Sequence, residues 1–330
     1  MIELNGGIRF GTSVVLDATR VQPESIVSHA HSDHLRRHKT IYATAPTLEF
    51  ARLSMGEFNG VPLEYGRSYH FGECLVRPEP AGHMLGSAQF VIDYAGYRIV
   101  YTGDFKLGDN VTCPPAKINE CDILFLDTTF GKKDFEFPDY AYLKQRLLEF
   151  VESSIYGGFI PVIFAYNLGK AQEVAKILDD GGFRSYATPQ ACAFARVCRK
   201  FDMIVESENV LETHYPEGGA VILPPFFRSM DDLFPGYPRR SCFVSGWALY
   251  QRVLRSFRAD EYLPLSDHAS YSDMVQYVET ARPSKVYCLF GFQEIVDDLR
   301  VKGFNAVRAS LANRKGIDRY LSPDFDFSGR

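Results

Sequence analysis

The sequence has few of the features that place a protein in a membrane or outside the cell. No apolar run approaches the ~18 residues that a membrane-spanning helix needs. The first residues, MIELNGGIRFGTSVVLD, have neither the basic stretch nor the apolar core of a secretory signal. The seven cysteines are odd in number and contain no CxxC pair, which is typical of reduced thiols. We therefore expect an intracellular, cytoplasmic protein with no membrane association.

The sequence also lacks a strong charge of either sign, since its formal net charge is −5 over 330 residues. This balance does not indicate non-specific attraction to nucleic acid. It does not exclude a nucleic-acid enzyme either, because a local basic channel can lie on an otherwise acidic surface. There is no internal repeat and no low-complexity segment. The length allows two domains, or one domain that carries a large insertion.

Two kinds of pattern divide the chain. Residues 1–132 read mostly as short strands separated by turns, with a hairpin at ELNGGIRF and one helix near PTLEFARLSM. From residue 133 the sequence alternates between helical spacing and buried strands, as in DYAYLKQRLLEFVESSI followed by GGFIPVIFAY. This alternation predicts a parallel α/β insert over 133–259. We expect the segment 260–330 to pack back onto the first domain.

The stretch VSHAHSDH holds three of the eight histidines and one aspartate. In an extended segment, side chains two residues apart point to the same side, so His29 and His31 can face a common centre. Asp33 and His34 follow at an expected turn and could face a second ion. Imidazole and carboxylate groups are ligands of Zn²⁺ and similar cations. We predict that all four bind metal, on a loop that caps the next helix; the alternative is a helix cap with solvated histidines.

Two later residues fit the same centre. His83 lies in the glycine-flanked loop AGHMLGSAQF, where the backbone can approach an ion closely. Asp104 follows a strand and a glycine in VYTGDF. A carboxylate at such a place could bridge two cations at the ~3.5–4 Å separation of two-metal hydrolytic sites. Each residue alone would be ambiguous between turn chemistry and function, but together with the first cluster they complete a ligand set.

The order of these motifs resembles the metallo-β-lactamase fold, an αββα sandwich that binds two metals at one edge of its sheets. LFLDTTFG, with Asp127, looks like the acidic motif of the β-CASP nucleases, and GGFIPVIFAYNLGKAQEV looks like the start of their inserted domain. LPLSDHASYSD resembles their histidine motif, at His268. The resemblance implies an α/β protein with a β-CASP insert and a metal-dependent nuclease activity. It also implies one or two divalent ions, Zn²⁺ first, with Mg²⁺ or Mn²⁺ possible at the second site.

One position departs from the RNA-processing members of that family, which carry a further metal-binding histidine after the next strand. Here the stretch is YCLFGFQ, with Phe290 in the corresponding place. The DNA-acting relatives, of the Artemis, Apollo and ligase-associated exonuclease types, also lack this histidine and have aspartate in the acidic motif. The resemblance therefore favours DNA as the substrate. Without that histidine, the predicted ligands of the second ion are Asp33, His34 and Asp104.

The mechanism expected from these residues is hydrolysis of a phosphodiester bond. Asp33 would orient the attacking water, and Asp127 would hold His268 so that the imidazole protonates the leaving oxygen or grips phosphate. The residues predicted to contact phosphate are Ser87, Lys106, Thr128, Thr129 and Lys170. We expect Trp247 to be packed in a core, although it could stack a base.

The other basic groups have a weaker link to the site. Arg36, Arg37, Lys132 and Lys133 could line a groove, but exposed basic pairs are usually a solvated face. We assign His38, His70 and His214 to structure or surface.

Four functions remain open, in order of preference. The first is a metal-dependent DNA exonuclease of DNA repair, directed by a 5′-phosphate and working with a DNA ligase or helicase. The second is an RNA endonuclease, exonuclease or 3′-end processing enzyme with the same chemistry. The third is a small-molecule hydrolase such as a lactonase or β-lactamase, which would not need so long an insert. The fourth is an inactive scaffold subunit, which would not need a complete ligand set.

Overall fold

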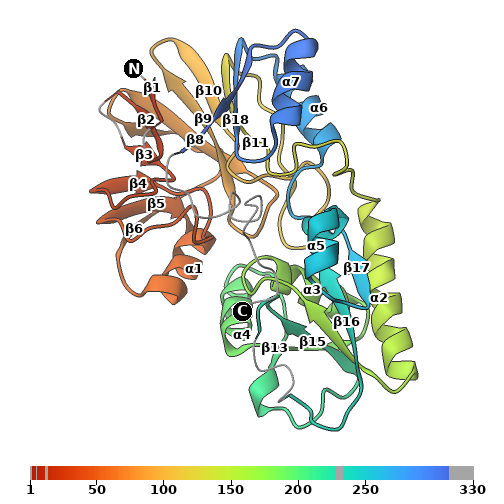
Figure 1. The fold of residues 1–330 in the computed structure, drawn as a ribbon. Coiled ribbons are helices and arrows are strands. Elements are labelled where there is room, and N and C mark those ends of the chain that lie inside the picture. The colour runs from red at the N-terminus through yellow and green to blue at the C-terminus, as the bar shows by residue number, and fades with distance from the viewer. Residues whose placement is uncertain (1, 5, 12–13, 228–232, 312–330) are drawn as a thin grey trace. The chain divides into compact units, whose positions relative to one another are not determined.

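The computed structural model describes residues 2–4, 6–11, 14–227 and 233–311, and these form two compact units (Figure 1). The first unit takes the described residues up to Asp109, Cys113–Glu136 and those from His268 onward. The second unit takes Asn110–Thr112 and Phe137–Asp267. The first unit is thus built from three separate stretches of the chain.

The second unit does not have the same ends as the predicted insert over 133–259. It begins at Phe137 and ends at Asp267, and it includes the short segment Asn110–Thr112. The later end has a physical reason, because the strand Glu261–Leu263 pairs in parallel with the strand Arg239–Val244 of the second unit's sheet. The domain boundaries predicted from sequence stay a prediction.

The first unit contains two mixed sheets, each antiparallel at one end and parallel at the other. In the first sheet β1, β2 and β3 pair antiparallel, and β3 to β6 pair parallel. Its strands, in spatial order, are β1 (Ile2–Glu3), β2 (Ile8–Phe10), β3 (Val15–Leu16), β4 (Glu24–Ile26), β5 (Thr40–Thr44) and β6 (Asn59–Leu63). The hairpin predicted at ELNGGIRF is confirmed by the pairing of Ile2 with Phe10.

In the second sheet β7 to β10 pair antiparallel, and β10, β11, β18 and β19 pair parallel. Its strands, in spatial order, are β19 (Ala306–Ala309), β18 (Lys285–Leu289), β11 (Ile123–Asp127), β10 (Tyr97–Tyr101), β9 (Ala88–Tyr94), β8 (Cys74–Pro80) and β7 (Tyr69–Phe71). Because β8, β10 and β11 run in the same direction, their carboxyl ends lie at one edge of the sheet. The segment from His268 onward thus adds β18 and β19 to a sheet begun much earlier in the chain.

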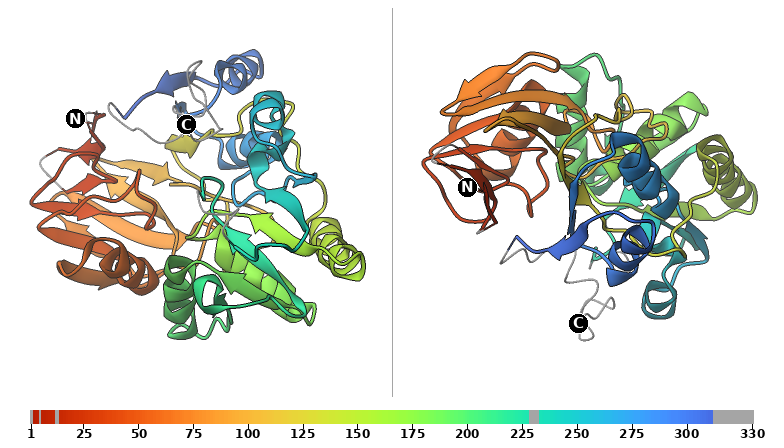
Figure 2. Two further views of the ribbon diagram at one scale, coloured as in Figure 1. Left: turned by 60° about the horizontal axis from the view of Figure 1, so that its bottom comes forward. Right: turned by 90° about the horizontal axis from the view of Figure 1, so that it is seen from above.

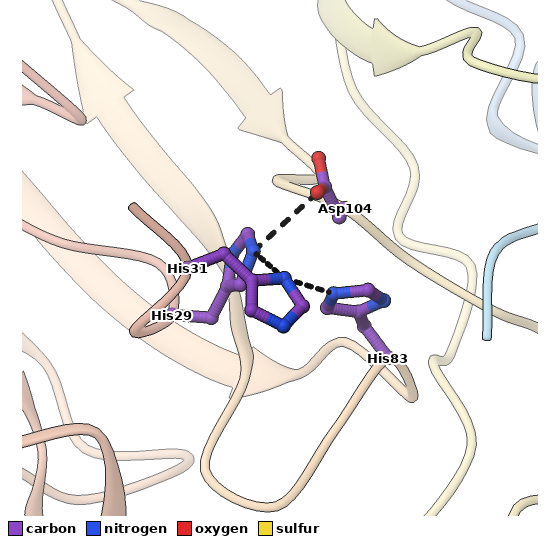
Figure 3. Close-up of side chains that lie close together, drawn as sticks. All are labelled: His29, His31, His83 and Asp104. Carbon is purple, nitrogen blue, oxygen red and sulfur yellow. Dashed lines mark hydrogen bonds and ion pairs between the residues drawn. The ribbon is translucent and has the colours of Figure 1, made fainter. Parts of the chain in front are cut away.

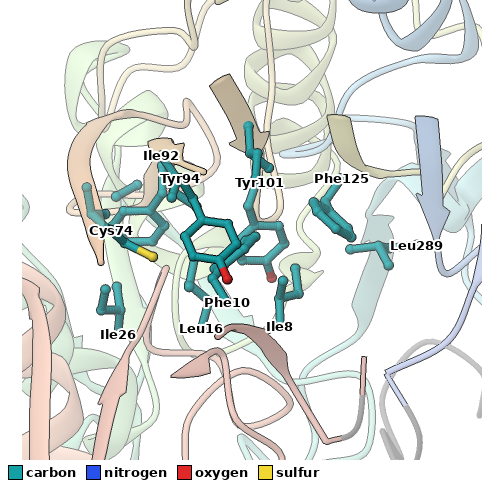
Figure 4. Close-up of a cluster of buried hydrophobic side chains, with 14 of the residues drawn as sticks. Ile8, Phe10, Leu16, Ile26, Cys74, Ile92, Tyr94, Tyr101, Phe125 and Leu289 are labelled. Carbon is teal, nitrogen blue, oxygen red and sulfur yellow. The ribbon is translucent and has the colours of Figure 1, made fainter. Parts of the chain in front are cut away.

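The two sheets pack face to face around one hydrophobic core (Figure 4). Apolar side chains of β2, β3 and β4 meet those of β8 to β11 and β18, with Phe10 against both Tyr94 and Phe125. The labelled residues of this core are Ile8, Phe10, Leu16, Ile26, Cys74, Ile92, Tyr94, Tyr101, Phe125 and Leu289. Burial of this apolar area, at about 25 cal/mol per Å², is what holds the sandwich together.

Helices cover the outer faces of the sandwich (Figures 1 and 2). On the first sheet, α1 (Ala45–Met55) packs Leu48 and Ala51 against Ile41 and Ala43 of β5. On the second, α6 (Tyr271–Ala281) places the Tyr277 ring against Phe105, and α7 (Gln293–Val301) follows β18. The order helix, sheet, sheet, helix confirms the predicted αββα architecture.

The second unit has one fully parallel sheet of six strands. Its strands, in spatial order, are β14 (Glu208–Asn209), β13 (Arg184–Ala187), β15 (Gly219–Leu223), β12 (Ile160–Phe164), β16 (Arg239–Val244) and β17 (Glu261–Leu263). The two central strands, IPVIF and GAVIL, are buried along their whole length, as expected of a sheet covered on both faces. This sheet confirms the predicted parallel α/β insert as a fold.

Two helices of the second unit, α2 and α4, begin at a side-chain cap. Side chains of Asp139 and Thr188 accept hydrogen bonds from backbone N–H groups at the starts of α2 and α4. The helices are α2 (Tyr140–Tyr156), α3 (Lys170–Asp180), α4 (Pro189–Arg199) and α5 (Gln251–Ser256), with 3₁₀ turns at Val210–Glu212 and Gly246–Leu249. The helical spacing predicted over DYAYLKQRLLEFVESSI is confirmed by α2.

No helix in the described part of the chain is long and apolar enough to cross a membrane. All seven cysteines are free thiols, and six are buried, with Cys113 half-buried.

Candidate metal centre and catalytic site

Three loops of the first unit bring a histidine- and aspartate-rich cluster together (Figure 3). His29 and His31 follow β4, His83 lies between β8 and β9, and Asp104 follows β10. One ligand atom from each of the four lies within 4.8 Å of the others. The convergence has a topological cause, because the carboxyl ends of β8 and β10 share one edge of the sheet and β4 packs across it.

The loop that carries the first histidines differs from the prediction in one respect. It does not cap a helix: a single turn at Ser32–His34 leads into β5, and α1 begins only at Ala45. The His34 N–H and the Leu35 N–H both donate to the His31 carbonyl, at 3.0 Å each. This turn directs His34 back toward the sheets. The prediction that the loop caps a helix was therefore wrong, but the predicted clustering of the side chains is found.

The four-residue cluster has the chemistry and spacing of a metal site. Nδ1 of His31 lies 3.1 Å from Nε2 of His29 and 3.1 Å from Nε2 of His83. Nε2 of His29 lies 3.4 Å from Oδ2 of Asp104. Ligands bound at ~2.0–2.1 Å to one tetrahedral Zn²⁺ lie about 3.3 Å from each other. The side chains therefore fit a divalent ion.

The protonation states at the cluster also suit an ion. Burial, and next the neighbouring His34, hold the pKa of His29 well below its ordinary value of 6.5. Burial alone would raise the pKa of Asp104, but His34 and His29 outweigh it and hold that pKa well below its usual range. A neutral imidazole and an ionised carboxylate are the forms that bind metal.

A second group of side chains adjoins the first through the other oxygen of Asp104. Nε2 of His34 lies 3.1 Å from Oδ1 of Asp104 and 3.7 Å from Oδ2 of Asp33. The Phe290 ring closes this side, with its centroid 6.3 Å from that of His34. The structure thus places Asp33, His34 and Asp104 together, with a phenyl group beside them.

Asp17 is the residue that sequence reasoning missed. It lies just after β3, is fully buried and has a left-handed backbone, with φ of 43°. Its Oδ2 is 2.6 Å from Nδ1 of His34 and accepts from the Tyr101 hydroxyl, while its Oδ1 accepts from the Ser28 N–H at 2.7 Å. The bond to Nδ1 leaves Nε2 of His34 facing Asp104. A single aspartate at a strand end carries no pattern that would have revealed this role.

The predicted pairing of Asp127 with His268 is formed. Nδ1 of His268 lies 2.9 Å from Oδ2 of Asp127, which is 1% exposed. The hydroxyl and the N–H of Thr129 both donate to Oδ1 of Asp127, at 2.6 and 2.9 Å. The His268 and His83 rings lie 4.6 Å apart, and a ligand atom each of Asp104, Asp127 and His268 lie within 4.8 Å of one another.

Several residues predicted to contact phosphate have other partners in the structure. The Ser87 hydroxyl accepts from the N–H groups of His83 and Met84, so it shapes the loop of His83. The Thr128 hydroxyl donates to the carbonyls of Leu289 and Phe290. These two side chains and Thr129 are buried and act on the site through the groups that they hold.

The two predicted lysines are also buried. Lys106 is 8% exposed and lies close to Asp104 in the chain. Lys170 is 2% exposed, and its ammonium is paired with Glu173 inside the second unit. The helix-start pattern did not show that Glu173 would pair with this lysine, and a phosphate contact of Lys170 stays a prediction.

The remaining assignments concern side chains outside the cluster. Trp247 is buried at 6% exposure, as expected of a core residue. Arg36 and Arg37 donate to backbone carbonyls, and Lys132 and Lys133 pair with Asp134 and Asp298. His38 is buried, whereas His70 and His214 are exposed.

The fold and the donor set define a metallo-β-lactamase-type centre, and comparisons with known proteins agree. No protein-family model matches the chain. A "Probable DNA ligase" of Opitutus terrae is 33% identical over 317 residues, which cover 93% of this chain and 31% of that protein. An "RNase J-like protein" of Methanocaldococcus jannaschii is 30% identical over 180 residues, covering 47% and 43%. "Endoribonuclease ysh-1" of Neurospora crassa is 26% identical over 195 residues, covering 56% and 20%.

A crystal structure of a protein of unknown function from Enterococcus faecalis matches 80% of this chain and 74% of its own, with a TM-score of 0.53. At 15% identity it supports the fold alone. The chain spans less than half the length of each of the three curated relatives named above. With its motifs in order and its folding pattern as described, the chain belongs to the β-CASP family of metallo-β-lactamase-fold nucleases.

Proposed function

We propose that the protein is a divalent-metal-dependent nuclease that hydrolyses phosphodiester bonds in DNA. The observation that carries the proposal is the convergence of His83 and Asp104 on the early histidine loop, although these residues are far apart in the sequence. Three imidazole nitrogens and a carboxylate oxygen form a donor set that suits Zn²⁺.

His29, His31, His83 and Asp104 would hold the first ion, and Asp33, His34 and Asp104 would hold a second, for which Mg²⁺ and Mn²⁺ are alternatives to Zn²⁺. Such ions, when bound, lower the pKa of water and offset the charge that develops on phosphate oxygens. The second group offers fewer protein ligands, because Phe290 supplies none. We therefore expect the second ion to be held more weakly than the first.

The chain's own residues would orient the reactants and move a proton. Asp33, which is 20% exposed beside His34, would orient the attacking water. Asp127 accepts from Nδ1 of His268, and Nε2 is the ring atom that would protonate the leaving oxygen or bind phosphate. Thr129 fixes the other oxygen of Asp127, which keeps the imidazole in one orientation. Ser87 and Thr128 shape neighbouring loops.

The preference for DNA is supported by two residues and one relative. Asp127 stands in the acidic motif and Phe290 replaces the additional histidine, as in the DNA-acting branch that the sequence resembles. A relative that matches 93% of the chain carries the name of a DNA ligase. We propose an exonuclease directed by a 5′-phosphate in DNA repair, in association with a DNA ligase or a helicase.

A matched panel of 5′-phosphorylated single-stranded DNA and RNA, of one length and sequence, tests the proposal. Metal-loaded protein should degrade the DNA faster, Asp104→Asn should lose turnover while it stays folded, and the exposed His70→Gln should behave as the wild type. Cleavage by metal-free protein, or full turnover by Asp104→Asn, would contradict the proposed reaction.

The second candidate is an RNA nuclease with the same chemistry. It is favoured by the names of two relatives, an RNase J-like protein and an endoribonuclease. Faster cleavage of the RNA in the same panel would select it.

A further inference from the structure

The buried lysine of the second unit is the feature that the proposed reaction leaves unexplained. Lys170 opens α3, and its Nζ donates to Oε2 of Glu173 at 2.5 Å. The two side chains are 2% and 1% exposed. Taking an ion pair out of water costs free energy that is recovered only with good geometry and further bonds. The further bonds that the pair makes should therefore show what role it has.

The other oxygen of Glu173 connects the pair to a distant part of the chain. The Tyr140 hydroxyl, at the start of α2, donates to Oε1 of Glu173 at 2.9 Å. The same hydroxyl accepts from the Val111 N–H at 3.1 Å. Val111 lies in Asn110–Thr112, the short segment of the second unit that follows Asp104 by only a few residues. One end of the buried chain of bonds thus holds the segment that leads away from the metal cluster.

The ammonium group of Lys170, at the other end of these bonds, contacts another segment of the second unit. Nζ of Lys170 lies 3.8 Å from Oδ2 of Asp267, which is 19% exposed. Asp267 ends the stretch Phe137–Asp267 of the second unit and directly precedes His268, the partner of Asp127. The same buried group therefore bonds to two segments of the second unit, Asn110–Thr112 and the end of Phe137–Asp267, that are close in sequence to residues of the candidate site.

We propose that Lys170, Glu173 and Tyr140 form a positioning cluster that fixes Asp267, and through it His268, for the reaction. The inference rests on the nuclease function proposed above. Lys170 acts through Asp267 rather than on phosphate, because its charge is already neutralised by Glu173. Small displacements of a proton donor reduce turnover strongly, since about 1 Å can cost as much as a hundredfold in rate.

Two variants separate positioning from stability. Lys170→Met combined with Glu173→Gln removes both charges at once, so no unpaired charge remains buried. Asp267→Asn removes the charge that faces the ammonium and leaves the pair intact. Lys176→Met is the matched control, because Lys176 lies on the same helix and pairs with Asp180 near the surface. All are measured for kcat, KM, metal content and thermal midpoint.

The double variant and Asp267→Asn should lower kcat by about ten- to a hundredfold with KM nearly unchanged, since binding is not removed. Metal content should stay at the wild-type level, and Lys176→Met should match the wild type. Unchanged kcat in Asp267→Asn, or a loss that only follows the folded fraction, would overturn the proposal.

The imidazole nitrogen spectrum of His268, assigned with His268→Gln, provides a readout that needs no activity. In the double variant and in Asp267→Asn, the Nδ1 signal should shift because its bond to Asp127 changes. If wild-type protein cleaves no nucleic acid but this shift occurs, the nuclease proposal fails and the positioning cluster stands. An unshifted signal would overturn the cluster whatever the activity.

Discussion

Individual side chains in this protein act through the groups that they orient as much as through direct contact. Asp17 shows this most clearly, because one carboxylate accepts from Ser28, His34 and Tyr101 in the absence of solvent. In the same way, Thr129 donates to Asp127 and so orients the carboxylate that contacts His268. Residues that hold metal ligands in one orientation affect metal affinity strongly.

Replacing Asp17 by Asn should weaken divalent metal binding by about ten- to a hundredfold. The amide can still accept at one atom, but its NH₂ group would face the donors of His34 and Tyr101. The measurement is a Zn²⁺ titration against a competing chelator. Asp93→Asn is the control, since Asp93 is half exposed and pairs only with the surface residue Arg98. Equal affinity of wild type and Asp17→Asn would contradict the assigned role.

His38 should make stability depend on pH. Burial lowers the pKa of His38 from its ordinary value of 6.5 to about 4, with Asp17 opposing the change and Arg36 adding to it. The folded state therefore favours the neutral ring, whose contribution is complete above pH 6.5 and is lost as the pH falls toward 4.

The free energy of unfolding should accordingly fall less between pH 6.5 and 4 in His38→Asn than in the wild type. Asn keeps an acceptor for the Gln22 N–H, which now donates to Nδ1 of His38 at 3.1 Å. Urea unfolding at several pH values measures the difference. His70→Asn, at an exposed site, should keep the wild-type slope; parallel slopes for His38→Asn would contradict the assignment.

At the scale of elements, the turn after β18 is the tightest part of the candidate site. Phe290 and Gly291 both have left-handed backbones, with φ of 66° and 64°. A Cβ on Gly291 would lie 1.6 Å from the carbonyl oxygen of Thr128. The end of β18 and the loop after β11 therefore approach each other as only glycine permits.

Gly291→Ala should lower the free energy of unfolding by about 3 kcal/mol or more, from backbone strain and steric overlap together. Gly303→Ala is the matched control: Gly303 also has a positive φ, of 92°, but its Cβ would meet nothing within 4 Å. That variant should lose only about 1–2 kcal/mol. Equal losses in urea unfolding would show that the close approach does not matter.

The elements themselves were largely predictable from sequence, and the environments of side chains were not. The sequence patterns located α1 and α2, because helical spacing is a local signal. The motifs around His29, Asp104 and His268 also predicted which residues converge. Asp17 and the pairing of Lys170 were missed or misread, because burial depends on segments that meet only in the folded chain. The turn at Ser32–His34 was mistaken for a helix start for the same reason.

At the scale of the whole molecule, the proposed metal links three loops of the first unit and none of the second. A ligand present at a hundred times its dissociation constant adds about 2.7 kcal/mol to the stability of the state that binds it. The four-residue cluster lies entirely within the first unit.

Chelation should therefore lower the thermal midpoint of the first unit and leave that of the second unchanged. Calorimetry with and without EDTA measures both, and His83→Ala identifies the metal-dependent transition because its midpoint should no longer respond to EDTA. An equal shift of both transitions, or no shift at all, would contradict a resident ion.

The first unit is completed only by a segment that follows Phe137–Asp267 of the second unit in the chain. Strand β18 pairs with β11 along five positions, and His268 is synthesised after the stretch Phe137–Asp267 of the second unit. A nascent chain on the ribosome thus exposes an open strand edge at β11 for the whole time that the second unit is being translated. Translation that stops before His268 yields a product without the partner of Asp127. If the proposed function is right, such truncated copies would be inactive rather than unregulated nucleases.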